Sequence, residues 1–494
     1  MTTVRILSRG AAALGLTLAS LATPLAAQRT APAPAALDRT VQPAAGRTPE
    51  LRVPAWERTR ISNGAEIIIT QKRDLPLVAF SVNFVGGAAN FESPDKLGVA
   101  SMTAAMLLEG TTSMTGEQLA DAMQMLGTQI GTGIGSESGT ITFTALKDRF
   151  EPALALLADM LMAPSFPEDA LERLRARRLV ALTQAKDQPG AIAANVFSKV
   201  LYGDQHPYGS VITEETISAI TRDDIVAFHR AYFRPGRAVI TVTGDVQPGA
   251  ARAAVERAFV RWQTGGDRPS FQYPPAPAPR PTTIYLVDKP GSAQSVFAIG
   301  HPGPARDTPD YFAITVMNHI LGGLFQSRLN HNIREVKGWS YGVRSSFAHG
   351  RGPGPFQAGG GIMTAKTDSA LIEFMQELRG VQGGEPFTED EITQGKESLI
   401  QSLPRRFGSV NGIGGAVATL YVQGLPERYY QEFASRIDAV TSEDLVRVAR
   451  QHIDLERLNI VIVGDRAAIE SPLRATGIAP VVLLDLGGRP VPTP

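Results

Sequence analysis

The chain contains a long internal repeat: two stretches align without a gap at an offset of 220 positions. The first begins at Ile220 and reads ITRDDIVAFHRAYFRPGRAVITVTGDV. The second begins at Val440 and reads VTSEDLVRVARQHIDLERLNIVIVGDR. Thr221 aligns with Thr441, and both stretches end on a strand-like run followed by Gly-Asp. An offset this long marks a whole domain, not a solenoid unit of roughly 20 to 50 residues. We therefore expect two similar domains joined head to tail.

Length and composition agree with two domains and exclude several functions. A chain of 494 residues is too long for one hydrophobic core. The balance of 48 basic and 48 acidic residues provides no net field that would attract nucleic acid or an anionic membrane. The chain has no cysteine, which excludes disulfides and thiolate zinc sites.

The N-terminus has the pattern of a cleavable signal peptide over residues 1–27. Arg5 and Arg9 precede the apolar run AAALGLTLASLATPLAA, which ends in small residues. The run is short and interrupted by Pro24, so it is poorly suited to span a bilayer, although a membrane anchor or a disordered leader is the alternative. Residues 28–53 are rich in Ala and Pro and read as a tether. We expect a soluble periplasmic or secreted protein without stable membrane insertion.

The remaining chain divides into two α+β domains, each expected to be an α/β sandwich with helices over one face of a sheet. The predicted segments are an N-terminal domain (54–263), a Pro-rich linker (264–282), a C-terminal domain (283–478) and a tail (479–494). The apolar start of the tail is expected to add an edge strand. Asn63-Gly64 predicts a hairpin turn. Apolar periodicity predicts helices at 98–108, 116–126, 149–162, 167–186, 311–321, 369–380 and 389–401.

Four motifs in order carry a resemblance to a known family. They are GVASMTAAMLLEGT at 98–111, LYGDQHPYG at 201–209, AYFRPGRAVITVTGDV at 231–246 and SRLNHNIREVKGWSYGV at 327–343. With the internal repeat, they resemble the pitrilysin/insulinase-type zinc peptidases (inverzincins), which include the mitochondrial processing peptidase. The resemblance implies two homologous α+β domains per chain. It also implies that two such chains, or two such halves, enclose a chamber for an extended peptide.

The family's metal site is degenerate in this sequence. The resemblance implies H-x-x-E-H on one helix, where two histidines bind zinc and the glutamate activates zinc-bound water, with a further glutamate ligand on a later helix. These positions fall on Ser101, Ala104, Ala105 and about Ala181. None of the seven histidines lies three or four residues from another, so no helical turn presents a pair. We expect no catalytic residue and no metal in this chain, with zinc in a partner subunit.

Other family positions are retained or altered. The resemblance implies that Arg334 and Tyr341 hold substrate peptide; the alternatives are a helix-end cation and a half-buried strand residue. The family's Asn-Ala-x-Thr edge strand is replaced by residues 130–133, IGTG, where strand addition by a peptide backbone is still possible. Glu109 could be a lone base but is expected to be a solvated residue near a helix end.

These observations predict a non-catalytic, substrate-positioning subunit of a heteromeric zinc metallopeptidase. Its partner would be a homologous chain bearing H-x-x-E-H, and its substrate a peptide. The alternative is a non-enzymatic peptide-binding or scaffold protein of the same fold, possibly a homodimer. A zinc-site homologue encoded next to this chain would favour the first hypothesis.

Overall fold

The computed structural model describes residues 51–262 and 270–491, which belong to one compact unit. The predicted signal peptide, most of the tether, the start of the linker and the last three residues lie outside these ranges. Within the described ranges, no helix is long and apolar enough to cross a membrane.

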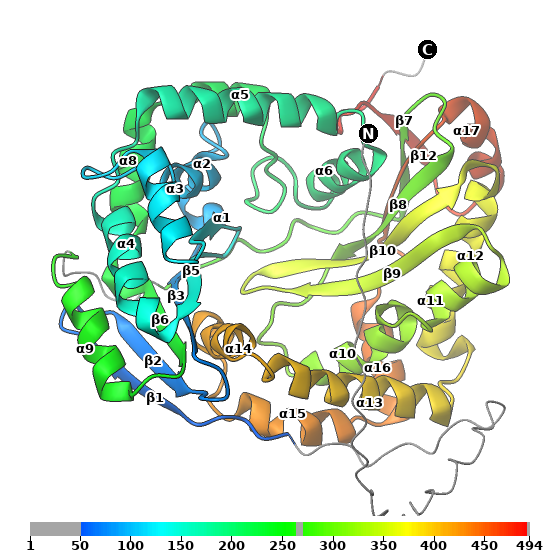
Figure 1. Ribbon diagram of the computed structural model, residues 1–494. Helices are drawn as coiled ribbons and strands as arrows, with labels where there is room; N and C mark the ends of the chain where they lie inside the picture. Colours follow the sequence, from blue (N-terminus) through cyan, green and yellow to red (C-terminus); the bar gives the residue numbers. More distant parts are fainter. Residues whose placement is uncertain (1–50, 263–269, 492–494) are drawn as a thin grey trace, which may run out of the picture. The chain divides into compact units, whose positions relative to one another are not determined.

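The first half contains a six-stranded mixed sheet in the order β1-β2-β6-β3-β5-β4 (Figure 1). Its strands are Trp56–Arg60 (β1), Glu66–Gln71 (β2), Leu77–Val85 (β3), Gly131–Ile134 (β4), Ser138–Leu146 (β5) and Ala238–Gly244 (β6). The β1–β2 hairpin turns at Asn63-Gly64 as predicted, and Gly64 adopts a φ of 92°, which favours glycine.

The second sheet has the order β12-β7-β11-β8-β10-β9, in which the last five strands repeat the arrangement β2-β6-β3-β5-β4. β12 takes the edge position of β1 but pairs parallel with its neighbour, whereas β1 pairs antiparallel. Its strands are Thr283–Asp288 (β7), Gln294–Pro302 (β8), Ser340–His349 (β9), Pro353–Met363 (β10), Asn459–Gly464 (β11) and Val481–Leu484 (β12). In both sheets the strand that closes the repeat, β6 or β11, pairs parallel with one neighbour and antiparallel with the other. β12 pairs parallel with β7, which confirms the predicted edge strand at the start of the tail. The α+β prediction is confirmed.

Helices account for most of the remaining chain. In the first half they are α1 (Ala88–Phe91), α2 (Val99–Met106), α3 (Gly116–Met125), α4 (Phe150–Met162), α5 (Glu168–Ala185), α6 (Pro189–Tyr202), α7 (Glu214–Ala219), α8 (Arg222–Tyr232) and α9 (Pro248–Ala258). In the second half they are α10 (Tyr311–Asn318), α11 (Arg328–Asn330), α12 (Thr367–Arg379), α13 (Glu389–Arg406), α14 (Val410–Gln423), α15 (Tyr429–Asp438), α16 (Ser442–His452) and α17 (Arg466–Ala475). The seven predicted helices are all present. The one predicted at 311–321 changes to a π-helical turn, His319–Gly323, after α10.

The repeated sequence builds the same local structure twice. Thr221 and Thr441 each cap a helix, α8 or α16, by accepting a hydrogen bond from the backbone N–H of Asp224 or Asp444. Each of these two helices leads into a strand, β6 or β11, that is buried at every position. A strand buried throughout needs cover on both faces of its sheet.

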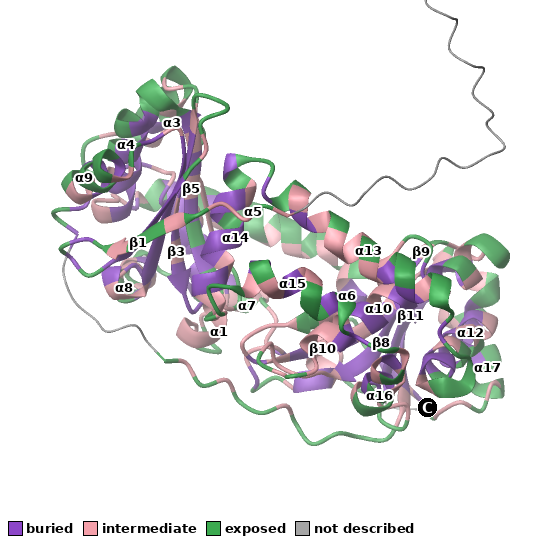
Figure 2. Ribbon diagram, turned by 90° about the horizontal axis from the view of Figure 1, so that it is seen from below, coloured by how far each residue is buried: buried purple, intermediate pink, exposed green. Residues whose placement is uncertain are grey.

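The two halves exchange helices to provide that cover. α14, from the second half, packs against β6 and β3 of the first sheet, and α6, from the first half, packs against β11 and β8 of the second. Ile68 and Val239 of the first sheet therefore share a core with Ile413 and Val417 of α14. Figure 2 shows the buried residues concentrated in the strands, whereas α9 and α17 present exposed outer faces. The prediction of helices over one face of each sheet was thus incomplete.

Candidate functional site

Helix α2 carries three of the four positions that the sequence analysis assigned to a degenerate metal site. Ala104 is buried, and its carbonyl oxygen accepts a hydrogen bond of 2.7 Å from the Thr132 hydroxyl on β4. The Ser101 hydroxyl donates to the Gly98 carbonyl oxygen at 3.0 Å, within its own helical turn. Ala105 is half-buried, and Ala181 is exposed on α5. Helix α2 thus contacts the edge strand β4, and the side chains at the four positions are three methyl groups and one hydroxyl that is already hydrogen-bonded.

These residues do not fit a zinc ion. Zinc in proteins is bound by imidazole, thiolate or carboxylate groups, and none of the four positions supplies one. Across residues 51–262 and 270–491, no three His, Asp or Glu side chains lie close enough together to hold a metal. The four positions carry no imidazole or carboxylate group.

Glu109, just beyond α2, is not the solvated residue that the sequence suggested. Its carboxylate lies 3.6 Å from the guanidinium groups of both Arg173 and Arg177 on α5. The side chain is 26% exposed. The helix that carries Ala181 therefore bears two arginines that are ion-paired to the end of α2.

Glu92 fixes the start of α2. Its Oε1 accepts hydrogen bonds from the backbone N–H groups of Gly98 (3.0 Å) and Ala100 (2.8 Å). These are N–H groups that a helix N-terminus leaves without an intrahelical partner. Burial raises the pKa of Glu92, although the two hydrogen bonds oppose that shift.

We expect Glu92→Gln to change how stability depends on pH, because an amide oxygen can accept the same bonds without charge. The raised pKa means that the folded state binds this proton more tightly than the unfolded state, whose carboxyl titrates near its ordinary value of 4.5. The wild-type protein should therefore lose stability relative to the variant as pH rises from 4.5 through the folded pKa. Urea unfolding across that range measures the difference, and a constant difference would contradict the assignment.

Strand β4 forms an open edge beside this helix. It is the last strand of the first sheet and pairs with β5, with Gly131 opposite Thr142 and Gly133 opposite Thr140. The outer backbone groups of an edge strand are available to pair with another extended segment. Strand addition by a peptide is therefore geometrically possible here.

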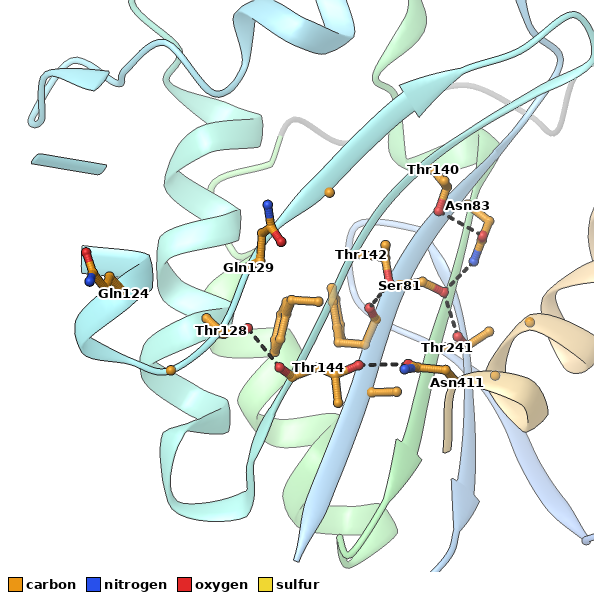
Figure 3. Close-up of a pocket in the computed structure, with 17 residues that line it drawn as sticks. Ser81, Asn83, Gln124, Thr128, Gln129, Thr140, Thr142, Thr144, Thr241 and Asn411 are labelled. Carbon is orange, nitrogen blue, oxygen red and sulfur yellow. Dashed lines mark hydrogen bonds between the residues drawn. The ribbon is translucent and has the colours of Figure 1, made fainter. Parts of the chain in front are cut away.

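A hollow of about 830 Å³ lies over the face of the sheet next to this edge (Figure 3). Hydroxyl and amide side chains line it: Ser81, Asn83, Gln124, Thr128, Gln129, Thr140, Thr142, Thr144, Thr241 and Asn411. Apart from alanine, glycine and phenylalanine, the lining is entirely of this kind, and it contains no charged residue. Asn411 comes from the exchanged helix α14, and its Oδ1 accepts a bond of 2.7 Å from the Thr144 hydroxyl.

Tyr341 is the second residue of the edge strand β9, and Arg334 lies in the last turn of the π-helical segment His331–Val336 that precedes it. The Arg334 guanidinium is 3.2 Å from the Glu335 carboxylate and 4.4 Å from the centre of the Phe325 ring. Tyr341 is 89% exposed, so it is not the half-buried strand residue that was the alternative. The described residues show no hydrogen bond or ring contact between Arg334 and Tyr341. Arg328 has a different role: it pairs with Glu391 and holds the fold locally.

Glu137 is a contact residue that sequence reasoning missed. It lies at the β4–β5 turn and accepts hydrogen bonds from the backbone N–H groups of Arg351 (2.8 Å) and Gly352 (3.2 Å) in the β9–β10 turn. The Tyr208 hydroxyl donates to the same carboxylate. This contact ties the edge hairpin of the first sheet to the edge hairpin of the second.

Comparisons with known proteins agree with this architecture. Residues 68–208 match the family described as Insulinase (Peptidase family M16), and residues 219–399 match the Peptidase M16 inactive domain. An uncharacterized zinc protease, YmxG of Bacillus subtilis, is 25% identical over 402 residues, which cover 80% of this chain and 95% of the relative. The non-peptidase homolog YmxG of Helicobacter pylori is 22% identical over 409 residues, 81% of this chain and 92% of the relative.

Two solved structures share the fold over most of this chain. The crystal structure of a peptidase M16 inactive domain from Pseudomonas fluorescens is 27% identical, has a TM-score of 0.76, and is matched over 83% of this chain and 98% of that one. A periplasmic protease of Escherichia coli, PqqL, shares the fold with a TM-score of 0.68 at 14% identity, with 85% of this chain and 50% of that chain covered.

Proposed function

The chain belongs to the insulinase family of peptidases (peptidase family M16), and we propose that it is a non-catalytic member that positions peptide for the zinc site of a homologous partner chain. The observation that supports this proposal is helix α2, which packs against β4 and carries Ser101, Ala104 and Ala105 at the positions that we assign to the family's metal-binding and proton-transferring residues. Helix α2 therefore lies beside the β4 edge without the side chains that would bind zinc there.

Features on both halves support a peptide as the bound molecule. Among the described residues β4 is the outermost strand of its sheet, next to α2, and main-chain pairing along such an edge is a common way to bind an extended peptide. Exposed Tyr341 and the forked guanidinium of Arg334 are suited to contact a peptide carbonyl or carboxylate. One relative is named a non-peptidase homolog and another a zinc protease, which is consistent with catalytic and non-catalytic members sharing this fold.

The proposed location is the periplasm or the cell exterior. Residues 1–27 have the pattern of an export signal, and the fold is shared with a protease described as periplasmic.

Co-expression with a homologous chain that carries H-x-x-E-H tests the proposal. We expect both chains to elute together on gel filtration, with about one zinc per complex and no stoichiometric zinc in this chain purified alone. Stoichiometric zinc in the isolated chain would contradict the loss of the metal site. A stable homodimer that binds no such homologue would instead support the scaffold alternative.

A further inference from the structure

We infer that the polar face of the first sheet beside β4 selects peptides whose alternate side chains are neutral hydrogen-bonding groups, amides or hydroxyls. This inference rests on the proposed function, because it assumes that a peptide adds to the β4 edge. It goes further by assigning a class of substrate side chain to the hollow shown in Figure 3.

The geometry of strand addition directs peptide side chains into this hollow. Successive side chains of a strand point to opposite faces of a sheet. On β4, Thr132 points to the face covered by α2, where it bonds to Ala104, so Gly131 and Gly133 lie on the other face, across from Thr142 and Thr140. Every second residue of an added peptide would therefore face the hollow, next to two positions that have no side chain.

The backbone does not require glycine at those two positions. A Cβ atom built on Gly133 would meet nothing within 4 Å, and one on Gly131 would meet only the Thr142 methyl group at 3.6 Å. Neither residue has the positive φ that favours glycine. Glycine within a strand is destabilising relative to alanine and often marks the close approach of a ligand. The two glycines thus keep a path open from the strand edge to the hydroxyl groups on β5.

The hydroxyl groups on β5 are set to accept hydrogen bonds. Thr140 donates to Asn83 Oδ1, Thr142 to the Phe80 carbonyl oxygen and Thr144 to Asn411 Oδ1. Each hydroxyl has one hydrogen and two lone pairs, so lone pairs are what these groups still offer. The side-chain amides of Gln124, Gln129 and Asn411 add donors to the same hollow. Amide and hydroxyl side chains of a peptide can donate to these lone pairs and accept from these amide groups.

Charged and apolar side chains fit this surface less well. The lining contains no charged residue, so an ammonium or carboxylate entering it would lose water without gaining a counter-charge. An aliphatic side chain would cover hydroxyl groups without replacing their bonds to water.

Peptide binding to the full chain, alone or in its complex, tests the inference. The probes are capped, fluorescently labelled peptides with valine at alternate positions and glutamine, serine, leucine, aspartate or lysine between them, measured by fluorescence anisotropy. We expect the glutamine and serine peptides to bind roughly 2- to 10-fold more tightly than the leucine peptide for each side chain that enters the hollow. The aspartate and lysine peptides should bind most weakly.

Two variants test whether the preference for glutamine and serine peptides arises in the hollow. A Cβ atom on Gly133 meets nothing within 4 Å, so Gly133→Val should narrow the open path. It should weaken glutamine-peptide binding by about tenfold or more while leaving thermal stability unchanged or higher. The double variant Thr140→Val, Thr144→Val should remove the preference for glutamine over leucine. Gly249→Val on α9 and Thr183→Val on α5 are matched controls outside the hollow and should change neither property.

The outcomes separate the inference from the proposed function. Binding of all five peptides with equal affinity, or unchanged binding by a folded Gly133→Val variant, would overturn the inference and leave a general peptide-binding role in place. Binding of no peptide, by the chain or its complex, would overturn both.

Discussion

Arg334→Ala is expected to lower the kcat/KM of the partner's peptide cleavage by roughly 10- to 100-fold. Hydrogen bonds to charged groups contribute about 1.5 to 3 kcal/mol, and 1.4 kcal/mol corresponds to about a factor of ten. In the free chain the guanidinium contacts Glu335 and the Phe325 ring on a partly exposed surface, so its removal should leave the core intact. Tyr341→Phe keeps the exposed ring and loses only the hydroxyl, so its effect should be smaller. Cleavage kinetics of the reconstituted complex measure both.

The matched control for this prediction is Arg428→Ala. Arg428 also lies in the second half and pairs with a neighbouring glutamate, but its side chain is 79% exposed and far along the chain from Arg334. It should leave cleavage unchanged. All variants should form the complex normally on gel filtration. If an intact complex of the Arg334→Ala, Tyr341→Phe double variant cleaves at the wild-type rate, both residues have structural roles only.

Phe197→Ala should destabilise the protein by about 3 to 5 kcal/mol, the range found when a buried phenylalanine is truncated. Phe197 is 3% exposed on α6 and packs with Tyr285 and Val461 of the second sheet. Helix α6 belongs to the first half by sequence but packs into the core of the second half. Truncating Phe197 should therefore destabilise both halves together. We therefore expect one cooperative urea transition at a lower midpoint.

Val180→Ala is the control for Phe197→Ala. Val180 is 57% exposed on the neighbouring helix α5, so its truncation should change the free energy of unfolding by less than about 0.5 kcal/mol. Two separate transitions in the Phe197→Ala variant, with one half keeping its wild-type midpoint, would show that the exchanged helix does not couple the halves.

The sequence allowed the two-domain plan to be predicted because local signals encode it. The repeat predicted two equivalent domains, and Thr221 and Thr441 begin equivalent helices followed by equivalent strands. The exchange of α6 and α14 could not be predicted. Both helices are apolar enough to be buried, but nothing local distinguishes the sheet of their own half from the sheet of the other.

Features of the candidate site that depend on the position of a residue within a sequence motif could be predicted. Features that depend on contacts between residues far apart in the chain could not. The alignment with H-x-x-E-H assigned three positions to residues that the structure places together on α2. Glu109 was taken as solvated because its partners lie more than sixty residues away on α5. Glu137 was missed for the same reason, since Arg351 is 214 positions distant. The alternating threonines at 140, 142 and 144 were a signal that could have indicated a polar sheet face.

Peptide cleavage by the reconstituted complex tests the central claim most directly. The assay measures the rate at which a fluorogenic peptide is cleaved by three samples. These are this chain alone, the H-x-x-E-H partner alone, and the two chains together with zinc. We predict no cleavage by this chain, little by the partner, and rapid cleavage by the mixture, abolished when the partner's motif glutamate is replaced by glutamine. Zinc-dependent cleavage by this chain alone, or equal cleavage by the partner with and without it, would contradict a non-catalytic, peptide-positioning role.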